Sequence, residues 1–245
     1  MASISRPFLL LSTRPEDETA AAELVSFVQT MGLTQGDIEQ RRIEAAPLGE
    51  VNLDDYSGVL LGGSPFNNTD AVKSKLQLRI EREIGTLVAE IIDRDFPLLG
   101  ACYGIGAIGT AIGARLGTEH AEDAGPVELS LVDATSSDPV LAGLPERFTS
   151  IVGHKEAVLE LPDKATVLVT GEACPVQMFR VKSNVYATQF HPELTGESLE
   201  LRLRTYAHLN YFDPAEMDSI LEAVYSSDYT WNNRILANFA NRYAR

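Results

Sequence analysis

The chain has 245 residues, 44% of them hydrophobic and 22% charged, which is typical of a globular protein with one substantial core. Its 20 basic and 35 acidic residues give a formal charge of −15, which argues against unaided binding to nucleic acid or to an anionic membrane. Two cysteines are too few for a disulfide framework or for a zinc site built on cysteine pairs, and the apolar run at residues 8–11 is too short for a signal sequence or a membrane span. We therefore expect a cytoplasmic protein that needs no metal and no other cofactor.

In the first half of the chain, strand patterns alternate with helix patterns. Short apolar runs predict strands at residues 8–11, 38–45, 59–61 and 96–101. Apolar residues at three- and four-residue spacings predict helices at residues 18–31, 74–94 and 105–116, the last of them ended by Gly117. Elements that alternate at these lengths favour an α/β fold, with a mostly parallel sheet and helices on both faces.

The second half is richer in strand patterns. Strands are predicted at residues 127–132, 148–152, 157–161, 166–170, 176–181 and 185–189. Helical patterns return at residues 199–209, 214–225 and 231–243, where the helices can cover one side of the sheet. Because no Pro/Gly/Ser-rich linker separates the halves, we expect a single domain over residues 1–245, with a β-rich insertion and a C-terminal helical extension from about residue 196 to residue 245.

The stretch PLLGACYGIGAIG, residues 97–109, places Cys102 between a buried strand and a helix of small residues. This arrangement is typical of a nucleophile elbow, in which flanking glycines such as Gly100 and Gly104 let other backbone approach closely. The start of the following helix would favour the thiolate form of the cysteine. The alternative is a buried structural cysteine, which behaves as a small hydrophobic residue.

A second stretch, Gln189-Phe190-His191-Pro192-Glu193, lies at the end of a predicted strand. A thiolate nucleophile needs a base that takes and returns its proton, and that base needs an orienting acceptor. His191 and Glu193 have the right chemistry for these two roles. A single histidine is otherwise more often a core or surface residue without a catalytic role.

A third stretch, Gly62-Gly63-Ser64-Pro65, follows another predicted strand. Backbone N–H groups at a glycine turn can stabilise a developing oxyanion, and the N–H of Tyr103, which follows the nucleophile, is the natural second donor. Alone, such a pair of glycines is usually just a turn.

Together, the three stretches resemble the class I glutamine amidotransferases, a family with a Gly-Gly oxyanion loop, a Gly-x-Cys-x-Gly elbow and a Phe-His-Pro-Glu segment on a flavodoxin-like α/β fold. The resemblance covers about residues 8–193, and it is closest to the amidotransferase domain of GMP synthase and its stand-alone relatives. It implies Cys102 as nucleophile, His191 as general base and acid, Glu193 as its orienting carboxylate, and the main chains of Gly63 and Tyr103 as oxyanion donors.

The resemblance also implies a set of substrate contacts at Gly62, Ser64, Gly106, His154 and Gln189. One of them departs from the family, which usually has glutamine four residues after the cysteine, where this chain has Gly106. Because glycine offers only main-chain groups, we expect either another γ-glutamyl compound as substrate or recognition of glutamine by different residues. Alternatively, Gly106 only lets the elbow helix pack closely.

The implied activity is hydrolysis of the side-chain amide of glutamine, which releases ammonia and glutamate through a γ-glutamyl thioester. The chain has no Gly-x-x-x-x-Gly-Lys-[Ser/Thr] loop and no ATP-pyrophosphatase motif, so ammonia would pass to a separate synthetase or acceptor subunit. Two alternatives remain: a stand-alone hydrolase of γ-glutamyl peptides or amides, and a regulatory binding protein that keeps the fold without catalysis.

Overall fold

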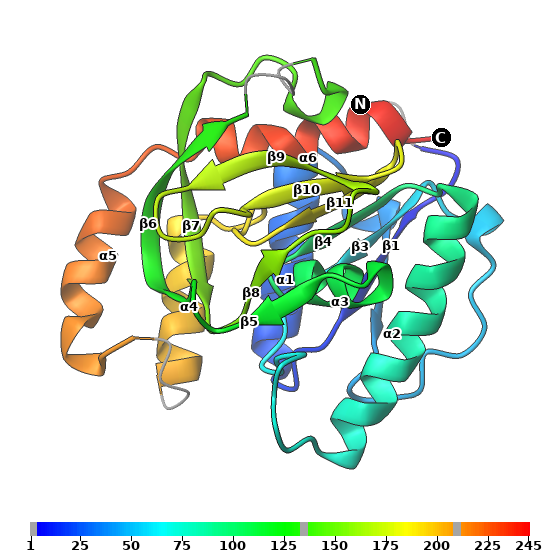
Figure 1. Ribbon diagram of the computed structural model, residues 1–245, viewed down its shortest axis with the longest axis horizontal. Helices are drawn as coiled ribbons and strands as arrows, with labels where there is room; N and C mark the ends of the chain where they lie inside the picture. The colour runs from blue at the N-terminus through cyan, green and yellow to red at the C-terminus, as the bar shows by residue number, and fades with distance from the viewer. Residues whose placement is uncertain (1–3, 133–136, 208–211) are drawn as a thin grey trace.

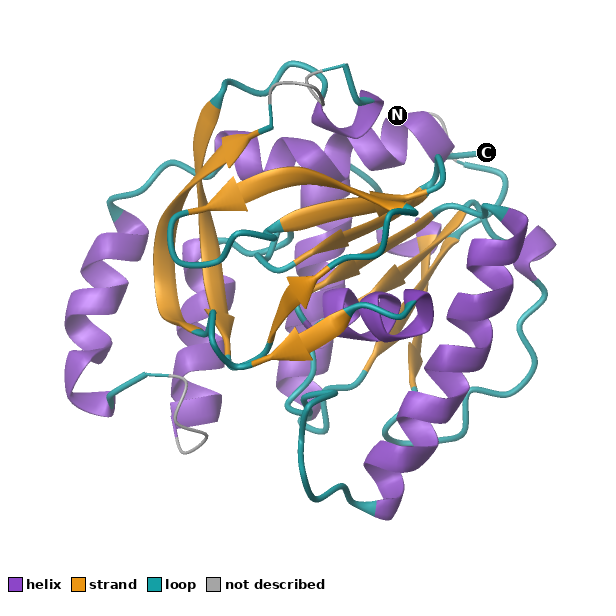
Figure 2. Cartoon of the chain, in the orientation of Figure 1, coloured by secondary structure: helices purple, strands orange, loops and turns teal. Residues whose placement is uncertain are grey.

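The computed structural model describes residues 4–132, 137–207 and 212–245, which form a sheet of nine strands with helices on both of its faces (Figures 1 and 2). The strands of this sheet are β1 (Phe8–Ser12), β2 (Ile38–Arg42), β3 (Gly58–Leu61), β4 (Leu98–Ala101), β6 (Glu122–Leu131), β7 (Arg147–His154), β9 (Ala165–Gly171), β10 (Met178–Val181) and β11 (Val185–Thr188). A small second sheet pairs β5 (Arg115–Gly117) with β8 (Ala157–Glu160). The helices are α1 (Asp17–Met31), α2 (Lys75–Arg94), α3 (Tyr103–Ile112), α4 (Gly196–Tyr206), α5 (Met217–Tyr225) and α6 (Thr230–Tyr243).

The strand order β2-β1-β3-β4-β11-β10-β9-β6-β7 divides the large sheet into two parts. The first five strands pair in parallel, in the 2-1-3-4-5 order of flavodoxin-like folds. From β11 onward every pairing is antiparallel. The predicted α/β fold, with a parallel core and a β-rich second half on the same sheet, is confirmed.

The two faces of the parallel strands are covered by different helices. Alternate residues of β1 point to opposite faces, so that Leu9 and Leu11 pack with α2 and α3, whereas Phe8 and Leu10 pack with α1 and α6. Helices α4 and α5 pack instead against β6 and β7 in a third apolar cluster, at the left of Figure 1. The sequence suggested that the three C-terminal helices cover one side of the sheet. In the structure they do not share one side, because α6 packs with α1 and α4 packs with α5 in a different cluster.

Several predicted boundaries were wrong by a turn or less. The elbow helix stops at Ile112, because Gly113 takes a left-handed conformation with φ of 80°, and strand β5, Arg115–Gly117, includes the predicted stop at Gly117. The predicted helix at residues 214–225 begins with a short 3-10 turn, Pro214–Glu216, before α5. The predicted end of the helix at residue 209 lies outside the described residues.

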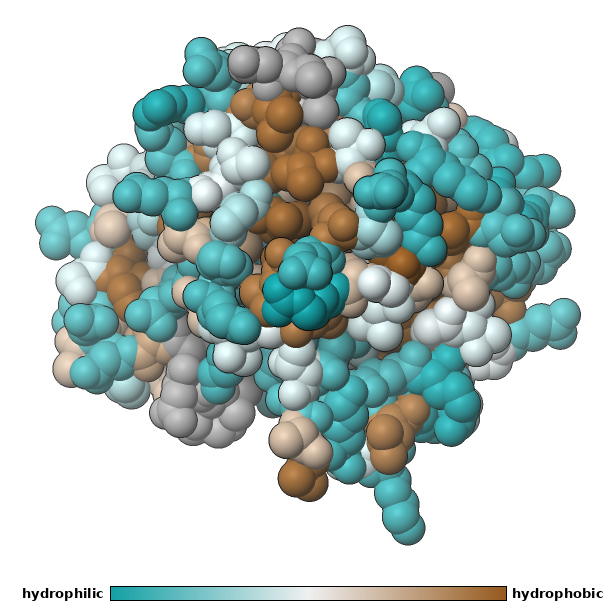
Figure 3. Space-filling model, viewed as in Figure 1, coloured by the Kyte–Doolittle hydropathy of each residue, from teal (hydrophilic) through white to brown (hydrophobic). Residues whose placement is uncertain are grey.

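Hydrophilic residues cover much of the face seen in Figure 3, including the margin formed by α2, whereas hydrophobic residues gather near its centre. Among the described segments, every helix is too short or too polar to cross a bilayer.

Candidate active site

The three stretches singled out in the sequence lie together because each follows a parallel strand. Strands β1, β3, β4 and β11 are neighbours in the sheet, and their carboxyl ends meet at one edge. The Gly62-Gly63 turn follows β3, Cys102 follows β4 and His191 follows β11. The loop after β1 adds Arg14, which the sequence motifs do not include. This edge is where open α/β sheets bind their ligands.

Cys102 has the backbone conformation of a nucleophile elbow. Its φ of 53° and ψ of −95° are unusual for a residue with a side chain, and they occur directly between β4 and α3. The turn is held from the strand side by a hydrogen bond from Cys102 N to Thr188 O (2.8 Å). A side chain at Gly100 would come within 3.0 Å of the backbone of Gly104, so both glycines allow a close approach that the tight turn requires.

His191 lies between the cysteine and a carboxylate. Its Nδ1 is 2.8 Å from Glu193 Oε1, and it lines the same pocket as Cys102. Arg202 of α4 donates to the same oxygen of Glu193 (3.1 Å), so that carboxylate contacts a cation as well as the imidazole. The side chain of Glu193 is fully buried, which makes these partners necessary for its charge.

The neighbouring charges raise the pKa of His191 and lower the pKa of Glu193. Burial alone would lower the pKa of His191, but the negative charges of Glu193 and Cys102 and hydrogen bonds to both raise it to about 9. Burial alone would raise the pKa of Glu193, whereas His191 and Arg202 lower it to about 2. A pKa of about 9 makes the imidazolium of His191, paired with the Glu193 carboxylate, the stable form at neutral pH, and this imidazolium can donate a proton to a leaving group.

The Gly62-Gly63 turn is packed against two charged side chains that the sequence did not reveal as part of the site. A side chain at Gly62 would come within 2.7 Å of the carboxylate of Glu23, and one at Gly63 would overlap Arg14 Nη2 and lie 3.2 Å from His191 Cε1. The N–H of Gly62 is used by Leu11 O (3.1 Å), which leaves the N–H of Gly63 as the candidate donor of this pair. Tyr103 begins α3, where an N–H group has no acceptor within its own helix.

Behind the turn, buried charges form a network that joins three elements. Arg14 Nε donates to Glu23 Oε1 (3.2 Å), and Ser12 Oγ donates to the other oxygen of that carboxylate (2.7 Å). Arg202 Nη2 lies 3.6 Å from Glu23 and so links this pair to Glu193. The network fixes α1 and α4 relative to the histidine.

Two pockets meet at Cys102. The polar pocket is narrow and is lined by Ser64, Phe66, Asn67, Cys102, Tyr103, His154, Glu156 and Gln189. The apolar pocket has a volume of about 560 Å³, part of which is open to solvent. It shares Ser64 and Cys102 with the polar pocket, and its other lining residues are Arg14, Pro65, Ala124, Val152, Gly153, His191, Leu194, Leu199, Arg202, Leu203, Tyr206 and Phe212.

Gly106 lies beside the polar pocket, and the structure explains why it carries no side chain. A methyl group there would overlap Glu156 Oε1 and would lie 2.5 Å from Asn68 Nδ2. These two residues are themselves hydrogen-bonded (2.8 Å), and the second oxygen of Glu156 accepts from the backbone N–H of Thr69 (2.8 Å). The space beside the elbow helix is therefore filled by a pair that bridges two loops.

Of the other predicted substrate contacts, Gln189 has the clearest opportunity to bind a ligand. Its side chain lines the polar pocket and is buried, and neither its amide nitrogen nor its amide oxygen has a partner among the described residues. Ser64 also lines this pocket, although its hydroxyl accepts from Phe66 N (3.1 Å). Gly62, by contrast, faces Glu23 and lines neither pocket.

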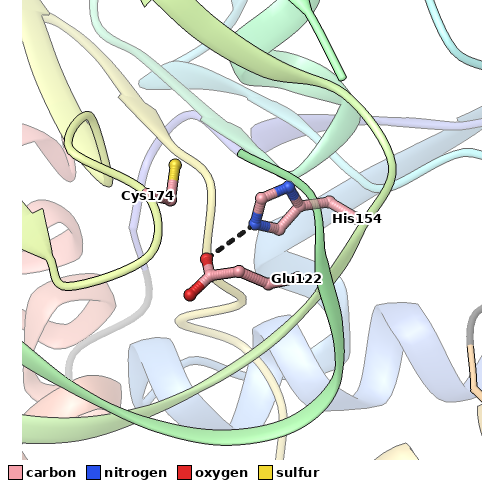
Figure 4. Close-up of side chains that lie close together, drawn as sticks. All are labelled: Glu122, His154 and Cys174. Carbon is pink, nitrogen blue, oxygen red and sulfur yellow. Dashed lines mark hydrogen bonds and ion pairs between the residues drawn. The ribbon is translucent and has the colours of Figure 1, made fainter. Parts of the chain in front are cut away.

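His154 belongs to a second buried cluster, with Glu122 and Cys174 (Figure 4). Its Nε2 is 2.8 Å from Glu122 Oε2, which also accepts from Gln177 Nε2 (2.6 Å). Burial, with the charge of Glu122 nearby, raises the pKa of the Cys174 thiol to about 12. The residue types could ligate zinc, but their direct hydrogen bonds already satisfy the imidazole and the carboxylate as a structural group.

Helix α6 holds the histidine segment from behind, which its sequence did not indicate. Asn232 Nδ2 donates to His191 O (3.0 Å), and Asn232 Oδ1 accepts from Ser150 Oγ (2.7 Å). The next residue, Asn233, donates to the carbonyls of Pro192 (2.9 Å) and Leu194 (3.2 Å). In the sequence, this contact is marked only by two adjacent asparagines at the start of a helix, and such asparagines more often face solvent than anchor a site.

The chain is similar to a known protein family and to several known proteins. The family model for class I glutamine amidotransferases matches residues 27–203. A glutamine-hydrolysing GMP synthase subunit of Methanothermobacter thermautotrophicus is 34% identical over 149 residues, which is 60% of this chain and 71% of that protein. The corresponding GMP synthase subunit of Thermoplasma acidophilum is 33% identical over 144 residues, which is 58% of this chain and 66% of that protein. A GMP synthase of Borreliella burgdorferi is 31% identical over 149 residues, but the match spans only 27% of its length.

Solved structures share the fold at low identity. A glutamine amidotransferase from Thermotoga maritima superposes with a TM-score of 0.77 at 19% identity, and 98% of each chain is covered. A glutamine amidotransferase from Methylobacillus flagellatus gives a TM-score of 0.72 at 15% identity, with 99% of this chain and 97% of that chain covered.

Proposed function

This chain belongs to the class I glutamine amidotransferase family, and we propose that it hydrolyses the side-chain amide of glutamine through a thioester on Cys102. The observation that carries the proposal is the meeting of a strained elbow cysteine with a buried His191–Glu193 pair (2.8 Å) at the edge formed by β4 and β11. Keeping a residue with a side chain at positive φ costs free energy, which is accepted mainly at functional sites.

In the proposed reaction, the Cys102 thiolate attacks the γ-carbonyl carbon, and the N–H groups of Gly63 and Tyr103 stabilise the oxyanion. Protonated His191 gives its proton to the leaving nitrogen, the C–N bond breaks, and ammonia departs. Water then gives a proton to His191 and attacks the thioester. The C–S bond breaks, and glutamate leaves with the thiolate restored.

In this proposal the lining residues of the polar pocket bind the glutamyl part of the substrate. Gln189 offers an amide whose oxygen and nitrogen have no partner among the described residues, and it can contact both the α-ammonium and the α-carboxylate. Glu156 supplies a negative charge that suits the α-ammonium. These two side chains would replace the contact that a glutamine at position 106 makes in the family pattern.

The proposal has two versions, which differ in the substrate and in what happens to the leaving group. Relatives named as subunits of a GMP synthase support transfer of ammonia to a separate acceptor subunit. The stand-alone alternative, hydrolysis of a γ-glutamyl peptide or amide, is favoured by the larger pocket beside Cys102. In both cases we propose a cytoplasmic enzyme that forms one domain over residues 1–245, which is supported by one large sheet with strands from both halves of the chain.

The test is covalent labelling combined with turnover. We expect 6-diazo-5-oxo-L-norleucine to add one mass equivalent to Cys102, and glutamine or a γ-glutamyl amide to be hydrolysed. Cys102→Ser should abolish both signals, whereas Cys174→Ser should keep them, since Cys174 lies in the separate buried cluster. If the intact chain shows neither an adduct nor turnover of any γ-glutamyl compound, a regulatory binding protein becomes the better description.

A further inference from the structure

We infer that the substrate carries an apolar amino acid on its γ-amide, so that the leaving group is that amino acid and not ammonia. The inference takes up the stand-alone alternative given under the proposed function, and it rests on the proposed thioester chemistry because it assumes the same attack by Cys102. Its basis is the apolar pocket, which is lined by both Cys102 and His191.

The position of His191 decides which pocket receives the leaving group. The leaving nitrogen must lie within hydrogen-bond reach of the imidazole that protonates it. His191 lines the apolar pocket, and it is absent from the lining of the polar pocket. The glutamyl part therefore extends into the polar pocket, and whatever is attached to the nitrogen extends into the apolar pocket.

The walls of the apolar pocket do not suit ammonia. Five of the residues that line it are hydrophobic and buried in the protein: Val152, Leu194, Leu199, Leu203 and Phe212. Ammonia is small and strongly hydrated and gains nothing from such walls, whereas an aliphatic or aromatic side chain does.

The charged groups of the apolar pocket indicate a carboxylate on the leaving group. Besides Cys102 and His191, the ionisable side chains that line this pocket are Arg14, Arg202 and Tyr206. Among the described residues, none of the acidic side chains lines it. Their partners Glu23 and Glu193 are fully buried behind the guanidinium groups. The accessible surface is thus apolar and cationic, which matches an amino acid bound through its free carboxylate.

Of the two cations, Arg14 is the better placed. Arg202 already contacts Glu193, and it lies 3.2 Å from His191 Nδ1. The hydrogen bond from Arg14 to Glu23 uses only Nε (3.2 Å), and its Nη2 is directed at Gly63, beside the expected position of the scissile amide. A guanidinium can bind a carboxylate through two parallel N–H groups.

The chemical balance of the proposed reaction is unchanged. The thiolate forms a bond to the γ-carbon, the C–N bond breaks, and the amino acid leaves with the proton from His191 on its nitrogen. Water and His191 then release glutamate as before. The products are glutamate and a free amino acid.

The first test uses the unmodified protein and a series of substrates. We expect kcat/KM for γ-Glu-Leu to exceed that for γ-Glu-Ala and for glutamine by about 10-fold or more, since a few methylenes in an apolar pocket discriminate to that extent. γ-Glu-Asp has a side chain of similar length but with a charge, and it should be a poor substrate. γ-Glu-leucinamide lacks the carboxylate, and it should also fall well below γ-Glu-Leu.

The second test pairs this substrate change with a variant. Arg14→Gln should reduce kcat/KM for γ-Glu-Leu by about 10-fold or more, as expected when a charged hydrogen-bond partner is lost, but should change γ-Glu-leucinamide much less. A merely structural role for Arg14 would reduce both substrates equally, which would overturn the inference. Arg79→Gln, on α2, is the matched control and should leave both values unchanged.

The remaining outcomes are also decisive. If glutamine is the best substrate and dipeptides are hydrolysed poorly, the inference is wrong while the proposed function stands. If no γ-glutamyl compound is turned over and Cys102 is not labelled by 6-diazo-5-oxo-L-norleucine, both are wrong.

Discussion

A side chain on Gly106 would occupy the space that the carboxylate of Glu156 fills. In most helices a glycine is a weakness, and replacing it by alanine stabilises the helix by about 0.5–1 kcal/mol. Here we expect the opposite, because the methyl group must displace Glu156 from Asn68 and Thr69. Gly106→Ala should lower the free energy of unfolding in urea and raise KM.

The matched control for this prediction is Gly85→Ala in the middle of α2, where a methyl group meets no atom within 4 Å. It should be neutral or stabilising. In a Glu156→Ala background the overlap at position 106 disappears, so Gly106→Ala should cost less there than in the native chain. Equal costs in the two backgrounds would show that Glu156 is not the obstacle.

The raised pKa of His191 predicts where activity declines in alkali. Acylation needs the imidazolium as proton donor, so kcat/KM should fall as the pH rises through about 9. Alkylation of Cys102 by iodoacetamide needs only the thiolate and should not fall over the same range. Comparing the two pH profiles separates the proton donor from the nucleophile.

Glu193→Gln tests the cause of that shift. The negative charge of Glu193 raises the pKa of His191, so its removal should move the alkaline limb of kcat/KM to lower pH as well as reduce kcat. An unmoved limb would mean that another group titrates there.

The motifs were readable from the sequence because each is local. Cys102 with its glycines, and His191 with Glu193, are pairs or triplets within a few residues, and the alternation of strands and helices brings the ends of β3, β4 and β11 to one edge. Arg14, Glu23 and Arg202 were not found, because they come from a loop, α1 and α4, and only the folded chain brings them together. No spacing in the sequence carries such long-range contacts.

The same reason explains the misplaced end of the elbow helix. Residues 114–116 continue an apolar pattern, yet Arg115–Gly117 pair with Ala157–Glu160 as strand β5. That partner lies more than one element away in the sequence, so the helical pattern alone could not reveal it. Tertiary pairing decided the local structure there.

Asn232 offers a test of how far α6 supports the site. Asn232→Ala removes the bond to His191 O and leaves Ser150 Oγ without its acceptor, so we expect a loss of unfolding free energy of about 1–3 kcal/mol. The variant should also reduce kcat, because the histidine segment loses its anchor. Asn238→Ala removes two similar bonds, to Val140 O and Ala142 O, away from the site. It should lower stability without a comparable effect on kcat, and equal losses of kcat would contradict an anchoring role.

The two cysteines should differ sharply in reactivity, and this difference can be measured without any substrate. Cys102 is partly exposed at the junction of two pockets, whereas Cys174 is fully buried, and burial beside Glu122 raises its thiol pKa to about 12. At pH 8 only a minute fraction of Cys174 is thiolate, so iodoacetamide should modify Cys102 alone in the folded protein. Peptide mass spectrometry identifies the labelled residue. In urea both cysteines should react, and Glu122→Gln should leave Cys174 unlabelled in the folded chain unless it opens the cluster. Rapid labelling of Cys174 in the native protein would show that the cluster around His154 is not closed.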